Sequence, residues 1–170
     1  MKSVYTFFNR HTLIKKQVKK NKSIIYGARS MNRQLTYGFL ERPTQDWDIY
    51  SKKPKRSARE LERTLDFHSG RDVYFSQPSK YHKNTHKVFH KGGDMRKGTM
   101  DDIGIADYSK TPRGLKIVRK NGLRYSHLNN TIRDKHKALR DPQFRFRWRK
   151  DKEDLNTIRV SNRLRKIKHI

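Results

Sequence analysis

Three aspartates stand at spacings that suit work on phosphate groups. Asp46 and Asp48 lie two residues apart in a stretch where charged residues alternate with apolar or aromatic ones. That alternation predicts a strand, on which both carboxylates point to one face while Trp47 and Ile49 point to the other. Adjacent carboxylates repel each other, and their natural use is to bind a divalent cation such as Mg²⁺ beside a nucleotide phosphate. The alternative is a pair of surface acids neutralised by the many Lys and Arg residues.

The third carboxylate, Asp107, lies near the end of the apolar segment Ile103–Tyr108. An isolated carboxylate on such a strand needs a partner. If this strand neighbours the one with Asp46 and Asp48, the three carboxylates converge as in two-metal phosphoryl transfer, where cations stabilise the attacking and leaving oxygens. Like charges would then raise the pKa of one carboxyl in the absence of metal. Alternatively, Asp107 caps a turn at the end of its strand.

A candidate phosphate-binding turn precedes these acids. A short apolar run ends at Gly27 and leads into a predicted helix, whose first N–H groups attract anions. Arg29 and Arg33 would add charge-assisted contacts. Arg42 either contacts phosphate or forms a plain salt bridge with a nearby acid.

The elements that must position these residues alternate along the chain. Apolar spacing predicts helices over residues 9–20, 29–35, 55–68 and 128–139 and a last helix that includes Trp148, Leu155 and Ile158. Strands are predicted over residues 23–26, 46–50, 72–76, 85–90, 103–108, 115–118 and 123–126, the last two joined by a hairpin at Asn121-Gly122. This order indicates an α/β (α+β) fold with a mixed central sheet flanked by helices. We expect a basic arm or helix over residues 1–21, one domain over 22–160 and a basic tail over 161–170.

Charge is the second strong signal. The 170 residues include 43 Lys+Arg and 16 Asp+Glu, a net charge of +27, and nine of the basic residues precede the first acid, Glu41. Such a surplus favours nucleic acid as the partner, through counterion release from phosphates, with RNA preferred over DNA. Solvated surface is the alternative. The expected nucleic-acid contacts are in the two basic ends: Lys15, Lys16, Lys19, Lys20, Arg145, Arg147 and Arg149.

The aromatic residues among these arginines leave two interpretations open. Phe144, Phe146 and Trp148 alternate with them, and they either stack on bases or pack a helix onto the core.

Several protein classes are excluded by the sequence. No apolar run approaches the ~20 residues that span a bilayer, and Met1–Phe8 is not a signal-peptide core. The absence of cysteine excludes disulfides, thiolate zinc sites and a Cys nucleophile. We therefore expect a cytoplasmic protein (intracellular or internal to a virion, and not secreted) with no membrane partner.

Together these motifs resemble the nucleotidyltransferase superfamily, which includes DNA polymerase β, poly(A) polymerases and small bacterial enzymes. The resemblance covers roughly residues 22–158 and lies in Gly27–Ser30, in Arg42–Ile49 and in the later strand with Asp107. The sequence motif around Asp46 and Asp48 resembles that of the abortive-infection toxin branch (AbiEii-like) and of related proteins of phages and large DNA viruses. Residues 135–139 and 150–155 are also similar to that branch.

The resemblance implies a minimal nucleotidyltransferase fold with C-terminal helices, and it also implies roles for individual residues. Asp46, Asp48 and Asp107 would hold Mg²⁺ and be catalytic, and Lys135 would contact nucleotide phosphates. The nucleotide-binding set would be Gly27, Ala28, Arg29, Ser30, Arg42 and Lys135. Ala28 departs from the Gly or Ser usual at its position, and its methyl group donates no hydrogen bond.

The implied reaction moves a nucleoside monophosphate from an NTP such as ATP to a hydroxyl of RNA, tRNA or protein. The alternative is a catalytically inactive protein of this fold that binds nucleic acid or forms part of a virion. A third reading, a basic protein of unrelated fold, requires that the three aspartates do not come together.

Overall fold

The computed structural model describes the backbone of residues 2–167 and the side chains of residues 10–167. The helices and strands follow one another in this order: α1(Lys2–Lys20), β1(Ile24–Ile25), α2(Gly27–Asn32), β2(Trp47–Ser51), α3(Pro54–Ser69), β3(Tyr74–Pro78), β4(Thr85–His90), β5(Ile103–Lys110), β6(Ile117–Lys120), β7(Leu123–Ser126), α4(Leu128–Arg140) and α5(Trp148–Ile167). Short 3₁₀ helices cover Gly38–Leu40 (η1) and Pro142–Arg147 (η2).

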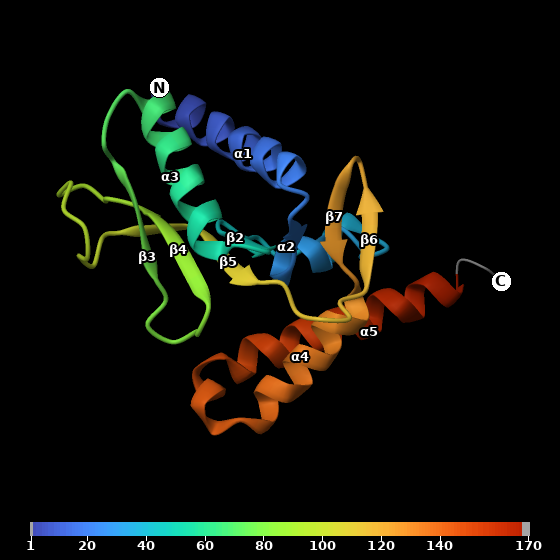
Figure 1. The fold of residues 1–170 in the computed structure, drawn as a ribbon. Coiled ribbons are helices and arrows are strands. Elements are labelled where there is room, and N and C mark those ends of the chain that lie inside the picture. The colour runs from blue at the N-terminus through green and yellow to red at the C-terminus, as the bar shows by residue number, and fades with distance from the viewer. Residues whose placement is uncertain (1, 168–170) are drawn as a thin grey trace.

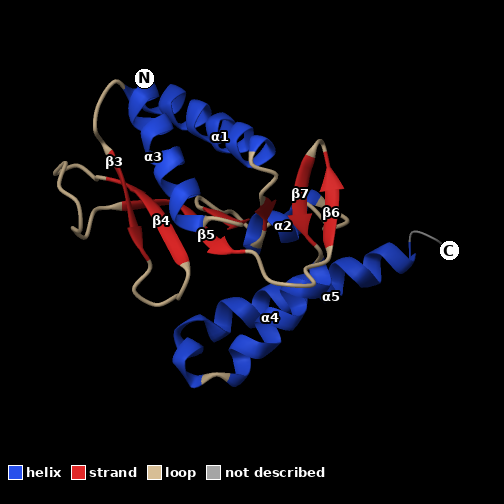
Figure 2. Ribbon diagram, viewed as in Figure 1, coloured by secondary structure: helices blue, strands red, loops and turns tan. Residues whose placement is uncertain are grey.

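One mixed sheet of seven strands, in the order β3-β4-β5-β2-β1-β7-β6, forms the centre of the molecule (Figure 2). Strands β2 and β5 are parallel, as are β1 and β7, and the other neighbours are antiparallel. Figure 1 shows α1 and α3 on one side of the sheet and α4 and α5 on the other. The expected class, a mixed sheet flanked by helices, is confirmed.

Helix α3 covers the sheet because its apolar residues lie on one stripe. Ala58, Leu61 and Leu65 are buried at the predicted spacing. Pro54 occupies the first turn, where its missing N–H costs nothing, and Gly70 ends the helix with a φ of 65°. This geometry fixes the direction in which the exposed face of α3 points.

Helix α1 packs on the same side as α3. Ile14 and Val18 are fully buried in the main core, within the segment expected as a basic arm or helix. Gln17 ties the layers together because its amide donates to the Ser57 backbone oxygen at 2.9 Å and accepts from the buried Tyr108 hydroxyl. Burial raises the pKa of Tyr108 well above its ordinary value, so this hydroxyl stays protonated.

A second, smaller core joins α2, α4 and α5 on the opposite side of the sheet. It contains Met31, Leu128 and Ile158, with Leu35 and Ile132 packed against them. Helix α5 crosses residue 161, where a basic tail was expected to begin, and continues to Ile167.

The hairpin at the sheet edge forms as predicted. Asn121 and Gly122 take φ values of 52° and 73°, the left-handed conformations that a tight two-residue turn requires.

Within residues 2–167, the helices lack the combined length and apolarity that a bilayer crossing demands.

Candidate active site

The turn between β1 and α2 is built against an aspartate. Gly27 has a φ of 65°, and a Cβ placed on it would lie 2.0 Å from Asp48 Oδ2. The Tyr26 N–H donates to the Asp48 backbone oxygen at 2.9 Å, which holds the turn beside β2. Glycine is therefore required here both by backbone conformation and by the close approach of Asp48.

Asp48 and Asp107 are direct neighbours in the sheet. Strands β2 and β5 run parallel with these two residues in register, as the sequence analysis required for convergence. Ile49, next to Asp48, is fully buried in the main core, so Asp48 faces the side of the sheet that carries α4. Both carboxylates line a cavity of about 650 Å³, together with residues of the Gly27 turn, α4 and η2.

Burial and repulsion between carboxylates raise the pKa of both carboxyls of this pair. Burial, followed by the charges of Asp46 and Asp107, raises the pKa of the Asp48 carboxyl to about 7. Burial also raises the pKa of Asp107, although a hydrogen bond from Lys87 opposes that rise. The Lys87 Nζ lies 2.7 Å from Asp107 Oδ2. Carboxyl groups with a raised pKa still hold protons near neutral pH, and a divalent cation would bind them by displacing those protons.

Asp46 stands at the rim of this group. It is exposed immediately before β2, and its Oδ1 accepts a hydrogen bond from the Thr44 hydroxyl at 3.2 Å. Its charge acts on both Asp48 and Asp107, which places it near them. Among the described side chains, no set of three or more His, Asp or Glu residues lies close enough to hold a metal ion. The structure thus places Asp48 beside Asp107 in the sheet, with the charge of Asp46 acting on both.

The predicted nucleotide-binding residues of α2 have intramolecular partners. The Arg29 guanidinium donates to the backbone oxygens of Thr44, Gln45 and Asp46 at 2.8–3.1 Å and lies 4.2 Å from the centre of the Trp47 ring. It therefore fixes the segment that leads into β2.

Two further members of that set are buried within α2. The Ser30 hydroxyl donates to the Ser126 backbone oxygen at 2.6 Å, and Ala28 is buried. Their contacts with a nucleotide stay predictions.

Lys135 and Arg42 belong to a buried ionic cluster between α4 and α5. The Lys135 Nζ lies 2.8 Å from Asp151 Oδ1 and 2.6 Å from Asp154 Oδ2. Arg42 Nε lies 3.4 Å from Asp154 Oδ1, and Arg147 binds Asp151 at 2.9 Å. Lys135 also lines the cavity, so the cluster forms part of the cavity wall.

The predicted nucleic-acid-binding residues of α1 are exposed along one helix. These are Lys15, Lys16, Lys19 and Lys20. Lys20 pairs with Glu60 at 3.1 Å.

Their counterparts near α5 differ from one another. Arg145 is exposed, Arg147 is held by Asp151, and Arg149 pairs with Glu153 at 3.0 Å. Their contacts with nucleic acid stay predictions.

The aromatic side chains between these arginines also divide. The Phe144 ring stacks on His82 with centroids 6.1 Å apart at the cavity, and Trp148 donates to the Ala138 backbone oxygen at 2.9 Å. Phe146 is 83% exposed. Two of the three therefore pack within the protein, and one remains open to solvent.

Two contacts at the cavity were not anticipated. Tyr50 and Tyr26 stack at 3.9 Å, and the Tyr26 hydroxyl bonds to Ser109 Oγ at 3.0 Å. The position of Tyr50 two residues after Asp48 was an available signal, because both face the same side of β2. Lys87 was missed because its neighbour Asp107 is 20 residues away and only the β4–β5 register brings them together.

Comparison with known proteins adds to this geometry. No protein-family model and no curated protein sequence matches the chain. It is similar to the crystal structure of the Megavirus polyadenylate synthase, with a TM-score of 0.75 and 18% sequence identity. That match covers 94% of this chain and 32% of the other, so this chain spans about a third of the synthase's length.

A weaker similarity is to the crystal structure of JHP933 from Helicobacter pylori. Its TM-score is 0.46 at 13% identity, over 76% of this chain and 55% of that one. The long match to a polyadenylate synthase agrees with the resemblance seen in the motifs around Gly27, Asp48 and Asp107. The chain therefore shares the fold of the matched part of that synthase, in agreement with the fold that the motif resemblance implies.

Proposed function

We propose that this protein transfers a nucleoside monophosphate from a nucleoside triphosphate to a hydroxyl group of RNA. The observation that carries the proposal is the pair Asp48 and Asp107, side by side at a cavity and packed against the Gly27 turn. Two adjacent carboxylates beside a glycine turn suit a phosphate chain and a cation better than they suit a purely structural role.

Mg²⁺ is the cation that this donor set fits. Asp48 and Asp107 would hold it, with Asp46 as a further carboxylate whose charge acts on both. The raised pKa of Asp48 and the closeness of Gly27 to Oδ2 support a site built for charge neutralisation. When bound, the cation would supply neutralisation of the phosphate oxygens. The described residues support no second metal position, so a two-metal site remains only an implication of the family resemblance.

The other groups at the cavity serve the substrate. In the proposed reaction the acceptor oxygen bonds to the α-phosphorus and the bond to pyrophosphate breaks. The acceptor proton leaves through a cavity carboxylate. Arg147 adds positive charge to the cavity lining, Lys87 adds it at Asp107, and the stacked tyrosine Tyr50 offers a ring at the cavity wall.

RNA is the acceptor we favour. The net charge of +27 exceeds what binding a free nucleotide needs, and the solved structure similar in fold is a polyadenylate synthase. A protein hydroxyl is the other acceptor class.

Transfer of label from each α-labelled NTP to a total RNA pool with Mg²⁺ tests the proposal. We expect label on RNA from wild type and none from Asp48→Asn. Asp72→Asn is the matched control, because Asp72 is exposed at the far edge of the sheet and, within the described residues, forms an ion pair with Lys91 alone. Label on protein alone would replace the RNA acceptor.

A specific observation also favours a second candidate, a nucleic-acid-binding protein without catalysis. Lys87 already occupies Asp107 Oδ2, and the described residues hold no three-carboxylate cluster. Under this candidate no NTP labels any acceptor, and wild type and Asp48→Asn bind RNA equally with the same dependence on salt.

A further inference from the structure

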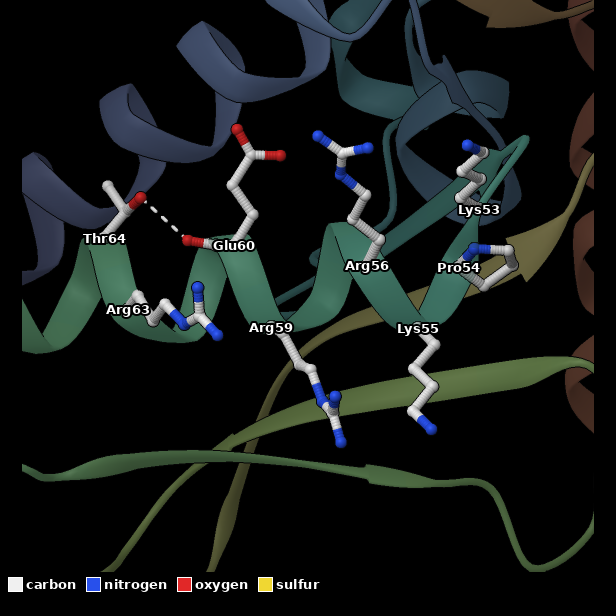
Figure 3. A pocket seen from close by; sticks show the side chains of 8 residues that line it. All are labelled: Lys53, Pro54, Lys55, Arg56, Arg59, Glu60, Arg63 and Thr64. Atoms are coloured by element: carbon white, nitrogen blue, oxygen red, sulfur yellow. Dashed lines mark hydrogen bonds between the residues drawn. The ribbon is translucent and has the colours of Figure 1, made fainter.

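A basic groove lies on helix α3, on the opposite face of the sheet from the cavity. Its volume is about 700 Å³. We call it the α3 groove, and it is lined by Lys53, Pro54, Lys55, Arg56, Arg59, Glu60, Arg63 and Thr64 (Figure 3). The two faces are distinct because Ser51 and Ile49 of β2 point to the α3 side while Asp48 points to the cavity.

Five cations of the α3 groove are exposed, and their side chains have no hydrogen bond or ion pair within the part of the chain that the structure describes: Lys53, Lys55, Arg56, Arg59 and Arg63. The acids of the same helix are already engaged. Glu60 accepts from Lys20 and Asn21, Glu62 accepts from Ser76, and Asp66 accepts from two backbone N–H groups of β3 and its approach. The positive charge of the groove is therefore uncompensated by the protein itself.

The spacing of these cations is regular. Lys55, Arg59 and Arg63 follow one another every four residues, so they rise about 6 Å per step and about 12 Å in total. Within a double helix each strand carries one phosphate per roughly 3.4 Å of helix axis, so at that spacing this span accommodates three to four nucleotides. In Figure 3, Lys55 and Arg59 extend towards the neighbouring strands, whereas Lys53 and Arg56 extend from the other flank of the helix.

A histidine of the neighbouring strand lies near these cations. Burial, followed by the charges of Lys55 and Arg59, lowers the pKa of His86 on β4. Its Nδ1 has no hydrogen-bond partner among the described residues. Lys55 and Arg59 of α3 are therefore close enough to act on the His86 ring of β4, which is neutral near pH 7.

The lining of the α3 groove favours a polyanion over a membrane. Its eight lining residues include no aromatic side chain and no large aliphatic one. Binding to a lipid surface depends on an apolar face that enters the acyl region, and this groove offers none. Long, unpaired cations along a line instead match a chain of phosphates, with no means of selecting particular bases.

We propose that the α3 groove binds the phosphate backbone of single-stranded RNA, independently of sequence and on the face opposite the cavity. The inference concerns binding alone, so it stands whether or not the cavity transfers nucleotides. In a nucleotidyltransferase, this surface would hold the body of an RNA whose end reaches the cavity.

Salt-dependent binding of a labelled 20-nucleotide oligouridine, measured by anisotropy without NTP or metal, tests this inference. The groove variant carries Lys55→Gln, Arg59→Gln and Arg63→Gln. The control carries Lys80→Gln, Arg96→Gln and Lys97→Gln, which remove the same charge from exposed residues of two loops. Equal thermal unfolding of the three proteins establishes that each variant is folded.

Each lost phosphate contact lowers the slope of log K against log salt by about 0.7 for a single strand, so we expect the groove variant to lose about 2. The slope of the control variant should differ from that of wild type by less than the change expected for one phosphate contact. Equal slopes and affinities for the two variants would overturn the proposal.

Two further arms separate other ligands. The first arm uses duplex RNA. If the groove substitutions lower the salt slope for duplex RNA as much as for oligouridine, the preference for a single strand is overturned. The second arm uses vesicles of phosphatidylserine and phosphatidylcholine. If the groove variant binds these vesicles more weakly than wild type but binds oligouridine equally well, the groove is a lipid-binding surface. Repeating the oligouridine measurement with Asp48→Asn separates this inference from the proposed function, because only catalysis depends on Asp48.

Discussion

Lys87 and Asp107 face each other across the antiparallel strands β4 and β5, with Nζ and Oδ2 2.7 Å apart. The ammonium group contacts one carboxylate of the pair and opposes the rise that burial causes in the pKa of Asp107. The contact makes the charge state of the site dependent on a residue that the aspartate motifs do not include.

Substituting Lys87→Met should raise the pKa of Asp107 above its value in the wild type. The reason is that Lys87 supplies the hydrogen bond and charge that oppose the effect of burial. Carboxyl NMR titration of the metal-free protein checks this shift. Lys91→Met is the control, since Lys91 pairs with Asp72. An unchanged Asp107 titration in Lys87→Met would show that the ion pair does not persist in solution.

The pKa of Asp48 gives a pH dependence of stability. Its folded pKa, about 7, exceeds the value near 3.9 expected in the unfolded chain. The native state therefore holds a proton that the unfolded state has released, and stability falls as pH rises from about 4 to 7. Thermal unfolding without metal should show this fall in wild type and a weaker fall in Asp48→Asn.

Magnesium should reverse that loss. A cation that binds only the folded protein stabilises it, so added Mg²⁺ should raise the unfolding temperature of wild type at pH 8. Asp48→Asn should respond less, and Asp72→Asn should respond as wild type does.

The pH dependence of the unfolding temperature has its own contradicting outcome. Identical curves for wild type and Asp48→Asn without metal would contradict the buried position of Asp48.

Gly27→Ala has a matched control within the chain. Gly27 and Gly70 both have a φ of 65°, but a Cβ at Gly70 meets nothing within 4 Å. Each substitution should cost about 1–2 kcal/mol for the left-handed conformation. Gly27→Ala should cost about 1–3 kcal/mol more, because its methyl group displaces Asp48. Urea unfolding of both variants measures the difference, and equal costs would exclude the close approach.

Lys135→Met tests the ionic cluster of the cavity wall. Asp151 and Asp154 are both buried, so loss of their shared ammonium should cost about 3–5 kcal/mol. The exposed pair of Arg149 and Glu153 should contribute at most about 1 kcal/mol, which makes Arg149→Met the control. Unchanged stability with weaker nucleotide binding in Lys135→Met would instead favour the phosphate contact that the family resemblance implies.

Local patterns in the sequence were enough to predict most elements. Alternation placed the strand of Asp48, apolar spacing placed α3, and Asn121-Gly122 placed the last hairpin. These features depend on residues within one or two turns of one another. Convergence of Asp107 with Asp46 and Asp48 was expected on the condition that their strands are neighbours, and β2 and β5 are neighbours with Asp48 and Asp107 in register.

What the sequence did not indicate depends on long-range packing. The partners of Lys135 come from α5, and Lys87 meets Asp107 only through the register of two strands. Arg29 was expected at phosphate, yet its guanidinium binds the backbone before β2. In each case a basic side chain had several acids or carbonyl groups within reach, and only the fold selects among them.

Single-turnover transfer of labelled nucleotide to RNA, compared between Asp48→Asn and Asp72→Asn, tests the proposed role of the Asp48–Asp107 pair most directly. We expect Asp72→Asn to match wild type and Asp48→Asn to lose at least about a hundredfold, since even indirect supports of a metal site cost 10- to 100-fold. Equal transfer by both variants would contradict the assignment of the active site to this pair.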